Sequence, residues 1–170
     1  MKLMKNFYAD LYLNSILELT PDMLIERNIK GLILDIDNTL VTYDDPEPTE
    51  EVLAWLSAME AAGIKAAFVS NNESPARVDV FNRELGLYAT SRSKKPLPVG
   101  FRRAMRALGV KPCECLAVGD QIFTDVWGGK NAGAKAFLVP PIKDRTDWFF
   151  RLKRKLEAPI IRRYKKKNGK

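Results

Sequence analysis

Two carboxylates, Asp35 and Asp37, stand two residues apart at the end of the apolar run of residues 31–37. Side chains two apart on an extended strand point to the same face, so both should project into one site. Neighbouring carboxylates repel each other and are tolerated best where a cation binds or where one of them stays protonated. The later stretch GDQIFTD adds Asp120 and Asp125. Because carboxylate oxygens are ligands that Mg²⁺ favours, the four residues together predict a magnesium site.

Other polar residues between these acidic stretches suit a phosphate group. Lys95 supplies a fixed positive charge, and Ser70 supplies a hydroxyl donor beside backbone amides. A metal, a lysine and hydrogen-bond donors can together hold phosphoryl oxygens. The chain contains no histidine, which excludes Ser-His-Asp and Cys-His catalysis and most zinc and haem sites. The chemistry must therefore come from carboxylates, lysine, hydroxyls or a hard metal ion.

The candidate residues follow short apolar runs, which occur at residues 31–37, 65–71, 87–92, 115–120 and 134–140. Helical patterns lie between the runs, with Thr49 and Ser74 as N-caps and with Gly109 and Gly133 as helix ends. Strict alternation of strand and helix predicts an α/β fold, a doubly wound parallel sheet of about five strands. In such sheets ligands bind outside the carboxyl ends of the strands, which is where the acidic residues fall.

Four segments of the chain, DIDNTL, VSNN, KKP and GDQIFTD, match in order and spacing the motifs of the haloacid dehalogenase (HAD) superfamily of phosphatases. The resemblance runs from about residue 30 to about residue 140 and implies a Rossmann-like core. More narrowly, the chain resembles the YqeG-like subfamily IIIA phosphatases. These are relatives of the mitochondrial phosphatidylglycerophosphate phosphatases.

The resemblance implies a role for each acidic residue. Asp35 would be the nucleophile, attacking phosphorus to form an aspartyl phosphate. Asp37 would be the general acid for the leaving alcohol and afterwards the base that activates water. Asp120, with Asp35 and the backbone carbonyl of Asp37, would hold Mg²⁺, and Asp125 would complete or orient that shell. Asp125 has an alternative role as an N-terminal helix residue that complements the helix dipole.

The resemblance also implies that Ser70, Asn71 and Lys95 bind the phosphoryl oxygens. Ser70 and Asn71 could instead cap the helix that follows them. Lys94 is an alternative to Lys95, which is preferred because the family pattern puts the lysine directly before proline.

The spacing of the motifs leaves no room for a cap domain. Only VTYDDPEP separates Leu40 from Thr49, and residues 72–94 are filled by one helix and one short strand. An uncovered site suits a substrate large enough to seal it, such as a protein, a nucleic acid end or a lipid head group.

The positive charge of the chain lies at its carboxyl terminus. The net charge is +7, and residues 151–170 hold ten Lys or Arg against the single Glu157, so residues 1–150 carry a net charge of −2. This divides the chain into a phosphatase domain, residues 1–150, and a basic amphipathic tail, residues 151–170. The tail is typical of a membrane-surface segment. A helix packed on the core with a solvated end, or an RNA-binding segment, are the alternatives.

These observations predict a capless, Mg²⁺-dependent phosphomonoester hydrolase, with phosphatidylglycerophosphate as the favoured substrate. A phosphatase for a nucleotide, sugar phosphate or phosphoprotein, and a non-catalytic RNA- or ribosome-binding module, are the alternatives. The two cysteines form no useful disulfide spacing, and Asp10 interrupts any signal-like segment, so we expect a cytoplasmic protein, peripheral to the inner membrane. Because the proposed catalytic groups lie between Asp35 and Asp125, we expect the tail to be dispensable for hydrolysis of a small soluble phosphate.

Overall fold

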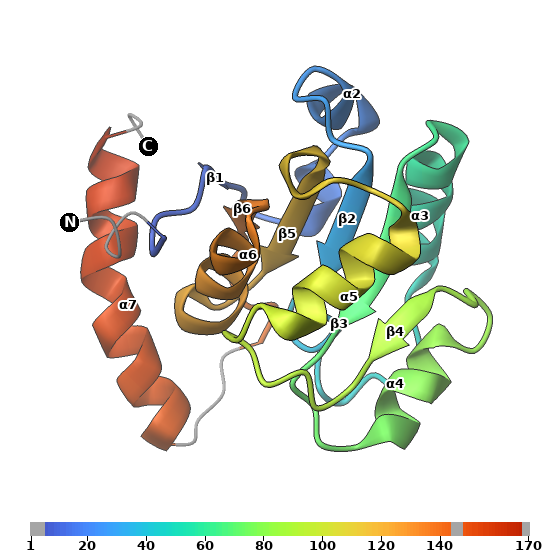
Figure 1. The fold of residues 1–170 in the computed structure, drawn as a ribbon. Coiled ribbons are helices and arrows are strands. Elements are labelled where there is room, and N and C mark those ends of the chain that lie inside the picture. Colours follow the sequence, from blue (N-terminus) through green and yellow to red (C-terminus); the bar gives the residue numbers. More distant parts are fainter. Residues whose placement is uncertain (1–5, 144–147, 168–170) are drawn as a thin grey trace.

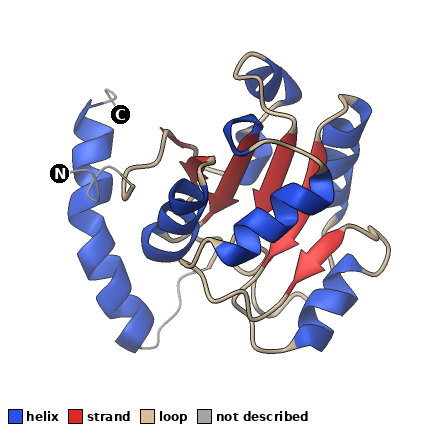
Figure 2. Ribbon diagram, in the orientation of Figure 1, coloured by secondary structure: helices blue, strands red, loops and turns tan. Residues whose placement is uncertain are grey.

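A parallel sheet of six strands organises the chain, in the order β1-β6-β5-β2-β3-β4 (Figure 2). The computed structural model describes residues 6–143 and 148–167. The strands are β1 (Leu11–Tyr12), β2 (Gly31–Leu34), β3 (Lys65–Val69), β4 (Tyr88–Thr90), β5 (Cys115–Gly119) and β6 (Lys135–Leu138). The predicted doubly wound parallel sheet is confirmed, with each of the five apolar runs forming a strand. The additional edge strand, β1, was not predicted because two residues are too few for a recognisable apolar pattern.

The central strand β2 is where the order of the strands reverses. Gly31 pairs with Lys65 of β3 on one side and with Cys115 of β5 on the other. The chain passes from β2 outwards through β3 and β4, then crosses back to β5 and continues outwards to β6. The carboxyl ends of β2 and β5 therefore flank the switch point at which such sheets bind ligands.

Helices cover the two faces of this sheet, and the last helix lies along its β1 edge (Figure 1). They are α2 (Pro21–Ile25), α3 (Glu50–Ala61), α4 (Pro75–Asn82), α5 (Val99–Leu108), α6 (Trp127–Ala132) and α7 (Trp148–Lys167). The predicted N-caps are confirmed, because Thr49 Oγ1 accepts from Val52 N and Ser74 Oγ accepts from Arg77 N, both at 3.3 Å. The predicted helix ends at Gly109 and Gly133 are also confirmed, since both residues are C-caps with positive φ angles of 68° and 94°.

Alternating side chains of β2 feed two separate apolar clusters. Leu32 and Leu34 pack with residues of α2, α3 and α4, whereas Ile33 packs with residues of α5 and α6. Burial on both faces explains why β2 is apolar without interruption. This packing holds the carboxyl end of the strand, and the loop that follows it, in a fixed position.

The carboxyl-terminal helix α7 runs along the β1 edge of the molecule (Figure 1). Its residues Ile160 and Ile161 pack against a third cluster, formed by Ile122, Val126, Ala136 and Leu138. The helix begins at Trp148, inside the range predicted for the phosphatase domain. In the described ranges, no helix is both long and apolar enough to cross a membrane.

No segment of the described residues folds as a cap over the carboxyl ends of the strands. Residues 35–49, between β2 and α3, are free of helices, and α4 is the one helix between β3 and β4. The site is therefore open at this edge of the sheet, as the motif spacing predicted.

Candidate active site

The carboxyl ends of the two central strands present acidic residues to one another. Asp35 directly follows β2, and its backbone N–H donates to Val118 O of β5 at 3.0 Å. Asp120 directly follows β5 and is completely buried. The parallel pairing of β2 and β5 thus brings together two residues that are 85 positions apart in the sequence.

Asp35, Asp120 and Asp125 form a buried acidic triad. One carboxylate oxygen of each lies within 4.8 Å of the others. Lys95 Nζ lies 2.8 Å from Asp35 Oδ1 and 2.6 Å from Asp125 Oδ1. Three ionised carboxylates and one ammonium would leave a net negative charge in this buried site. Burial of uncompensated charge is unfavourable. A divalent cation would offset this charge, and an all-oxygen donor set suits a hard cation such as Mg²⁺.

Burial governs the ionisation of the predicted nucleophile. It raises the pKa of Asp35 from 3.8 to about 7, against the opposing effect of Lys95, while Asp125 and Asp37 add to the rise. Burial alone would lower the pKa of Lys95, but Asp125 and Asp35 raise it above its usual value. Lys95 is therefore cationic, and any further positive charge near Asp35 would favour its nucleophilic carboxylate form.

Asp125 is held by the turn that carries it. This π-helical turn, Ile122–Val126, leads directly into α6. Asp125 Oδ2 accepts from Gln121 N at 3.1 Å and from Thr124 Oγ1 at 3.2 Å, while Oδ1 faces Lys95. The carboxylate thus contacts Lys95 and lies at the acidic triad, and its predicted role in a metal shell stays a prediction.

Asp37 faces a different pair of residues. Its Oδ2 accepts from Asn72 Nδ2 at 2.7 Å, and its Oδ1 lies 3.1 Å from Arg77 Nη2 in an ion pair that lacks hydrogen-bond alignment. Arg77 also donates to the backbone carbonyls of Thr42 and Pro46. The Asp37 carboxylate lies outside the triad, so its predicted link to the metal rests on its backbone carbonyl.

Asn72 and Arg77 were missed by the sequence analysis. Asn72 lies in the VSNN stretch, in which Ser70 and Asn71 are the residues predicted to bind phosphate. Arg77 lies in the first turn of α4, where the helix dipole disfavours a cation. An arginine at such a position indicates an acidic partner, and this signal could have pointed to Asp37.

The three predicted phosphate ligands lie near one another: Ser70, Asn71 and Lys95. Each makes its own set of hydrogen bonds. Ser70 is completely buried, and its Oγ accepts from Asn72 N at 3.0 Å. Asn71 Oδ1 accepts from Lys95 N at 2.7 Å, and its Nδ2 donates to Lys95 O at 3.1 Å. Asn71 therefore fixes the backbone of the lysine, and its direct contact with phosphate stays a prediction. Lys94 is exposed, so Lys95 is the lysine that reaches the carboxylates.

Asn38 joins the loop after β2 to the segment after β6. Its Nδ2 donates to Lys143 O at 2.8 Å, its Oδ1 accepts from Lys143 N at 3.1 Å, and its backbone O accepts from Ile142 N at 3.1 Å. It adopts a φ of 65°, a conformation that asparagine tolerates better than most residues. These contacts hold the loop that carries Asp35 and Asp37.

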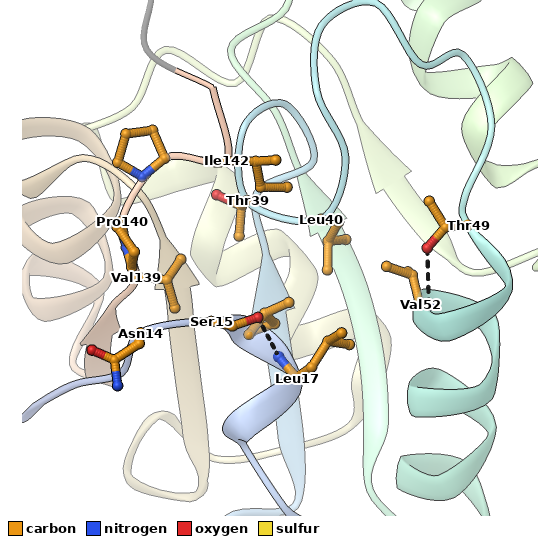
Figure 3. A pocket seen from close by; sticks show the side chains of 12 residues that line it. Asn14, Ser15, Leu17, Thr39, Leu40, Thr49, Val52, Val139, Pro140 and Ile142 are labelled. Carbon is orange, nitrogen blue, oxygen red and sulfur yellow. Dashed lines mark hydrogen bonds between the residues drawn. The ribbon is translucent and has the colours of Figure 1, made fainter.

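A cavity of about 370 Å³ lies beside the same loop (Figure 3). Its lining combines aliphatic side chains, such as Leu40, Val52 and Ile142, with polar ones, such as Asn14 and Thr39. Thr39 Oγ1 is buried and has no hydrogen-bond partner among the described residues. The cavity contains none of the triad carboxylates, so it neighbours the acidic site without forming part of it.

Comparisons with known proteins identify the family. The haloacid dehalogenase-like hydrolase family matches residues 40–133. The chain is 38% identical to "Probable phosphatase YqeG" of Bacillus subtilis over 97% of this chain and 95% of that protein. It is also 36% identical to human N-acylneuraminate-9-phosphatase, over 41% of this chain and 31% of that enzyme.

Solved structures agree in fold. A HAD phosphatase from Thermococcus onnurineus superposes with a TM-score of 0.54 at 18% identity, over 69% of this chain and 89% of that one. The cobalt-bound deoxy-D-mannose-octulosonate 8-phosphate phosphatase of Haemophilus influenzae gives a TM-score of 0.52 at 18% identity, over 66% of this chain and 69% of that one. The family match and the similarity to YqeG over nearly its whole length show that the chain belongs to the haloacid dehalogenase-like hydrolases, as a phosphatase of that family.

Proposed function

We propose that the protein is a Mg²⁺-dependent phosphomonoester hydrolase in which Asp35 is the nucleophile. The observation that carries the proposal is the position of Lys95, whose ammonium contacts both Asp35 and Asp125 at the buried triad. Asp35, Asp120 and Asp125 would hold the cation, which would neutralise charge on the phosphoryl oxygens. Lys95 would bind the same oxygens, with Ser70 and Asn71 at the neighbouring strand end.

The reaction would proceed in two displacements. An oxygen of Asp35 would bond to phosphorus as the bond to the leaving alcohol breaks, and Asp37 would give its proton to that alcohol. Asp37 would then take a proton from water, which attacks phosphorus and releases phosphate with the regenerated Asp35 carboxylate. Asn72 and Arg77 support this role, because they hold Asp37 beside the nucleophile.

Hydrolysis of a generic aryl phosphate tests this proposal. The purified protein should release phosphate in the presence of Mg²⁺ and should stop when a chelator is added. Asp35→Asn should lose turnover by many orders of magnitude, because the aspartyl phosphate can no longer form. Asp79→Asn, at an exposed position of α4, is the matched control. A fully active Asp35→Asn protein would exclude the mechanism.

For the physiological substrate we propose a lipid phosphate, with phosphatidylglycerophosphate favoured, at an anionic membrane surface. The open site supports this choice. On α7, Trp148, Leu152 and Leu156 are exposed at intervals of four residues, which places them along one side of the helix. Arg151 and Lys155 are exposed beside them. Apolar and basic side chains on one surface suit the interface of an anionic bilayer, so the enzyme would act from the cytoplasm as a peripheral protein.

Vesicle binding and a substrate screen test the lipid proposal. The screen compares phosphatidylglycerophosphate in mixed micelles with soluble phosphate esters. Leu152→Gln should weaken binding to vesicles rich in phosphatidylglycerol, whereas Ile25→Gln, an equally apolar exposed residue on α2, should not. Binding should also fall as salt rises, since screening shortens the reach of the basic residues to about 8 Å at 0.15 M. Equal binding by both variants, or tighter binding of the intact protein to RNA at matched salt, would contradict the membrane role.

Small soluble phosphates are the second candidate substrates. Two of the similar proteins are a glyceraldehyde 3-phosphate phosphatase from Pyrococcus furiosus and the human N-acylneuraminate-9-phosphatase, although each matches over less than half of this chain. A preference for sugar phosphates in the same screen would favour this alternative over the lipid.

A further inference from the structure

The carboxyl-terminal helix places a buried acid against the site. Glu157 is the only acidic residue of α7 and is completely buried, whereas its neighbours Lys155 and Leu156 are exposed. Its Oε1 accepts from the backbone N–H groups of Ile122 at 2.8 Å and of Phe123 at 3.3 Å. A carboxylate is thus removed from water in order to meet two backbone donors.

The N–H groups of Ile122 and Phe123 are the first two of the π-helical turn that carries Asp125. The first N–H groups of a helical segment have no partner within the segment, and leaving them buried and unpaired is unfavourable. The residue before the turn, Gln121, makes no side-chain cap. Glu157, 35 residues beyond Ile122 in the chain, supplies the acceptor instead.

Packing brings the same turn of α7 onto the same segment. Ile160 and Ile161, three and four residues after Glu157, contact the cluster that includes Ile122 and Val126. One face of α7 therefore meets the 120–126 segment through a carboxylate and two aliphatic side chains. That segment begins at Asp120 and contains Asp125, two of the three triad residues.

We propose that Glu157 is a positioning residue for the acidic site. Its carboxylate fixes the backbone of Ile122 and Phe123, and this keeps Asp120 and Asp125 directed toward Asp35 and Lys95. The proposal rests on the proposed function in taking the triad as the cation site. The family match covers residues 40–133, so Glu157 lies outside the matched residues.

Direct measurement of Mg²⁺ binding by calorimetry, with no substrate present, tests the proposal. Glu157→Ala should weaken Mg²⁺ binding by about 10–100-fold, the usual effect of removing a group that orients metal ligands. Glu157→Gln keeps an oxygen acceptor and should stay within about threefold of the wild type. Hydrogen exchange of the Ile122 and Phe123 amides should accelerate in Glu157→Ala and not in Glu157→Gln.

A packing control separates the carboxylate from general docking of the helix. Ile161→Ala removes an aliphatic contact of the same face but leaves the acceptor in place, so it should lower thermal stability and spare Mg²⁺ affinity. The proposal is overturned if Ile161→Ala weakens Mg²⁺ binding as much as Glu157→Ala does. It is also overturned if folded Glu157→Ala binds Mg²⁺ like the wild type.

If Glu157→Ala does not fold, Glu157→Asp replaces it, since it keeps the charge but shortens the side chain by one methylene. Weaker Mg²⁺ binding by Glu157→Asp than by Glu157→Gln would support a positioning role, and wild-type affinity in both would overturn it. Because binding and exchange are measured without turnover, an inactive wild type that binds Mg²⁺ would refute the phosphatase proposal alone. A wild type with no Mg²⁺ binding would refute the role of Glu157 at the site.

Discussion

Gly119 and Asp125 approach so closely that position 119 has no room for a side chain. A Cβ at Gly119 would collide with Cβ, Cγ and Oδ2 of Asp125. The last residue of β5 thus lets the Asp125 carboxylate lie against the strand end, from which it reaches Lys95.

Gly119→Ala is therefore expected to displace Asp125 and to weaken both Mg²⁺ binding and turnover by at least about tenfold. Gly31→Ala, at the opposite end of the sheet, meets the side chains of Val110 and Leu108 and is the matched control. It should lower stability without altering Mg²⁺ affinity, as measured by calorimetry. Unchanged Mg²⁺ affinity in Gly119→Ala would show that Asp125 is not held in this way.

Removal of the metal should expose the raised pKa of Asp35. With a folded-state pKa of about 7 against an ordinary value of 3.8, Asp35 retains its proton in the folded protein where the unfolded chain has lost it. Its contribution to the free energy of unfolding must therefore fall as pH rises from about 4 to about 7. In urea titrations with chelator, the wild type should lose more stability over this window than Asp35→Asn. Excess Mg²⁺ should reduce the difference, because a cation favours the carboxylate.

Arg77 should matter most for substrates whose leaving groups need a proton. Arg77→Met removes the ion pair with Asp37 and the hydrogen bonds to Thr42 and Pro46, so the general acid should be less well placed. General acid catalysis contributes about 10²–10⁴-fold, and a nitrophenyl leaving group needs little of it. Hydrolysis of an alkyl phosphate should thus fall further than that of nitrophenyl phosphate. Arg83→Met, at the exposed end of α4, should reduce neither; an equal loss for both substrates would contradict the assignment.

Deletion of residues 151–170 is expected to impair hydrolysis even of a small soluble phosphate. This differs from the expectation drawn from the sequence, because Glu157 contacts the turn that carries Asp125. Mg²⁺-dependent turnover of an aryl phosphate should fall by at least about tenfold in the truncated protein. A folded, truncated enzyme with wild-type kcat and Mg²⁺ dependence would show that the tail is dispensable for hydrolysis of a soluble phosphate.

The two cysteines should react differently with a thiol reagent. Cys113 is exposed, whereas Cys115 is buried in β5 and burial raises its pKa to about 12. With a chromogenic thiol reagent at about pH 8, one thiol per chain should therefore react in the native protein. Two should react in the unfolded protein. Rapid reaction of both in the native state would contradict the burial of β5.

The order of strands and helices, and the acidic residues at the strand ends, could be predicted from the sequence because both depend on local patterns. An uninterrupted apolar run such as that of β2 indicates a strand covered on both faces, and parallel pairing then gathers the carboxyl ends at one edge. Asp35 and Asp120 could be assigned to that edge from these patterns. The local sequence pattern gave no physical reason to choose Lys95 over Lys94 as the lysine of the site. The structure decides this, because Lys95 is buried against Asp35 and Asp125 while Lys94 is exposed.

Contacts between distant segments were decided by the tertiary structure alone. Arg77 and Asp37 are 40 residues apart, and Glu157 reaches Ile122 across 35 residues. The composition of the tail indicated an amphipathic basic helix, but periodicity within one helix cannot say which face docks or which backbone donors it meets. A lone acid among ten basic residues could be taken as an exposed charge. Glu157 is buried instead because the turn at Ile122 presents N–H groups that only a group from elsewhere in the fold could satisfy.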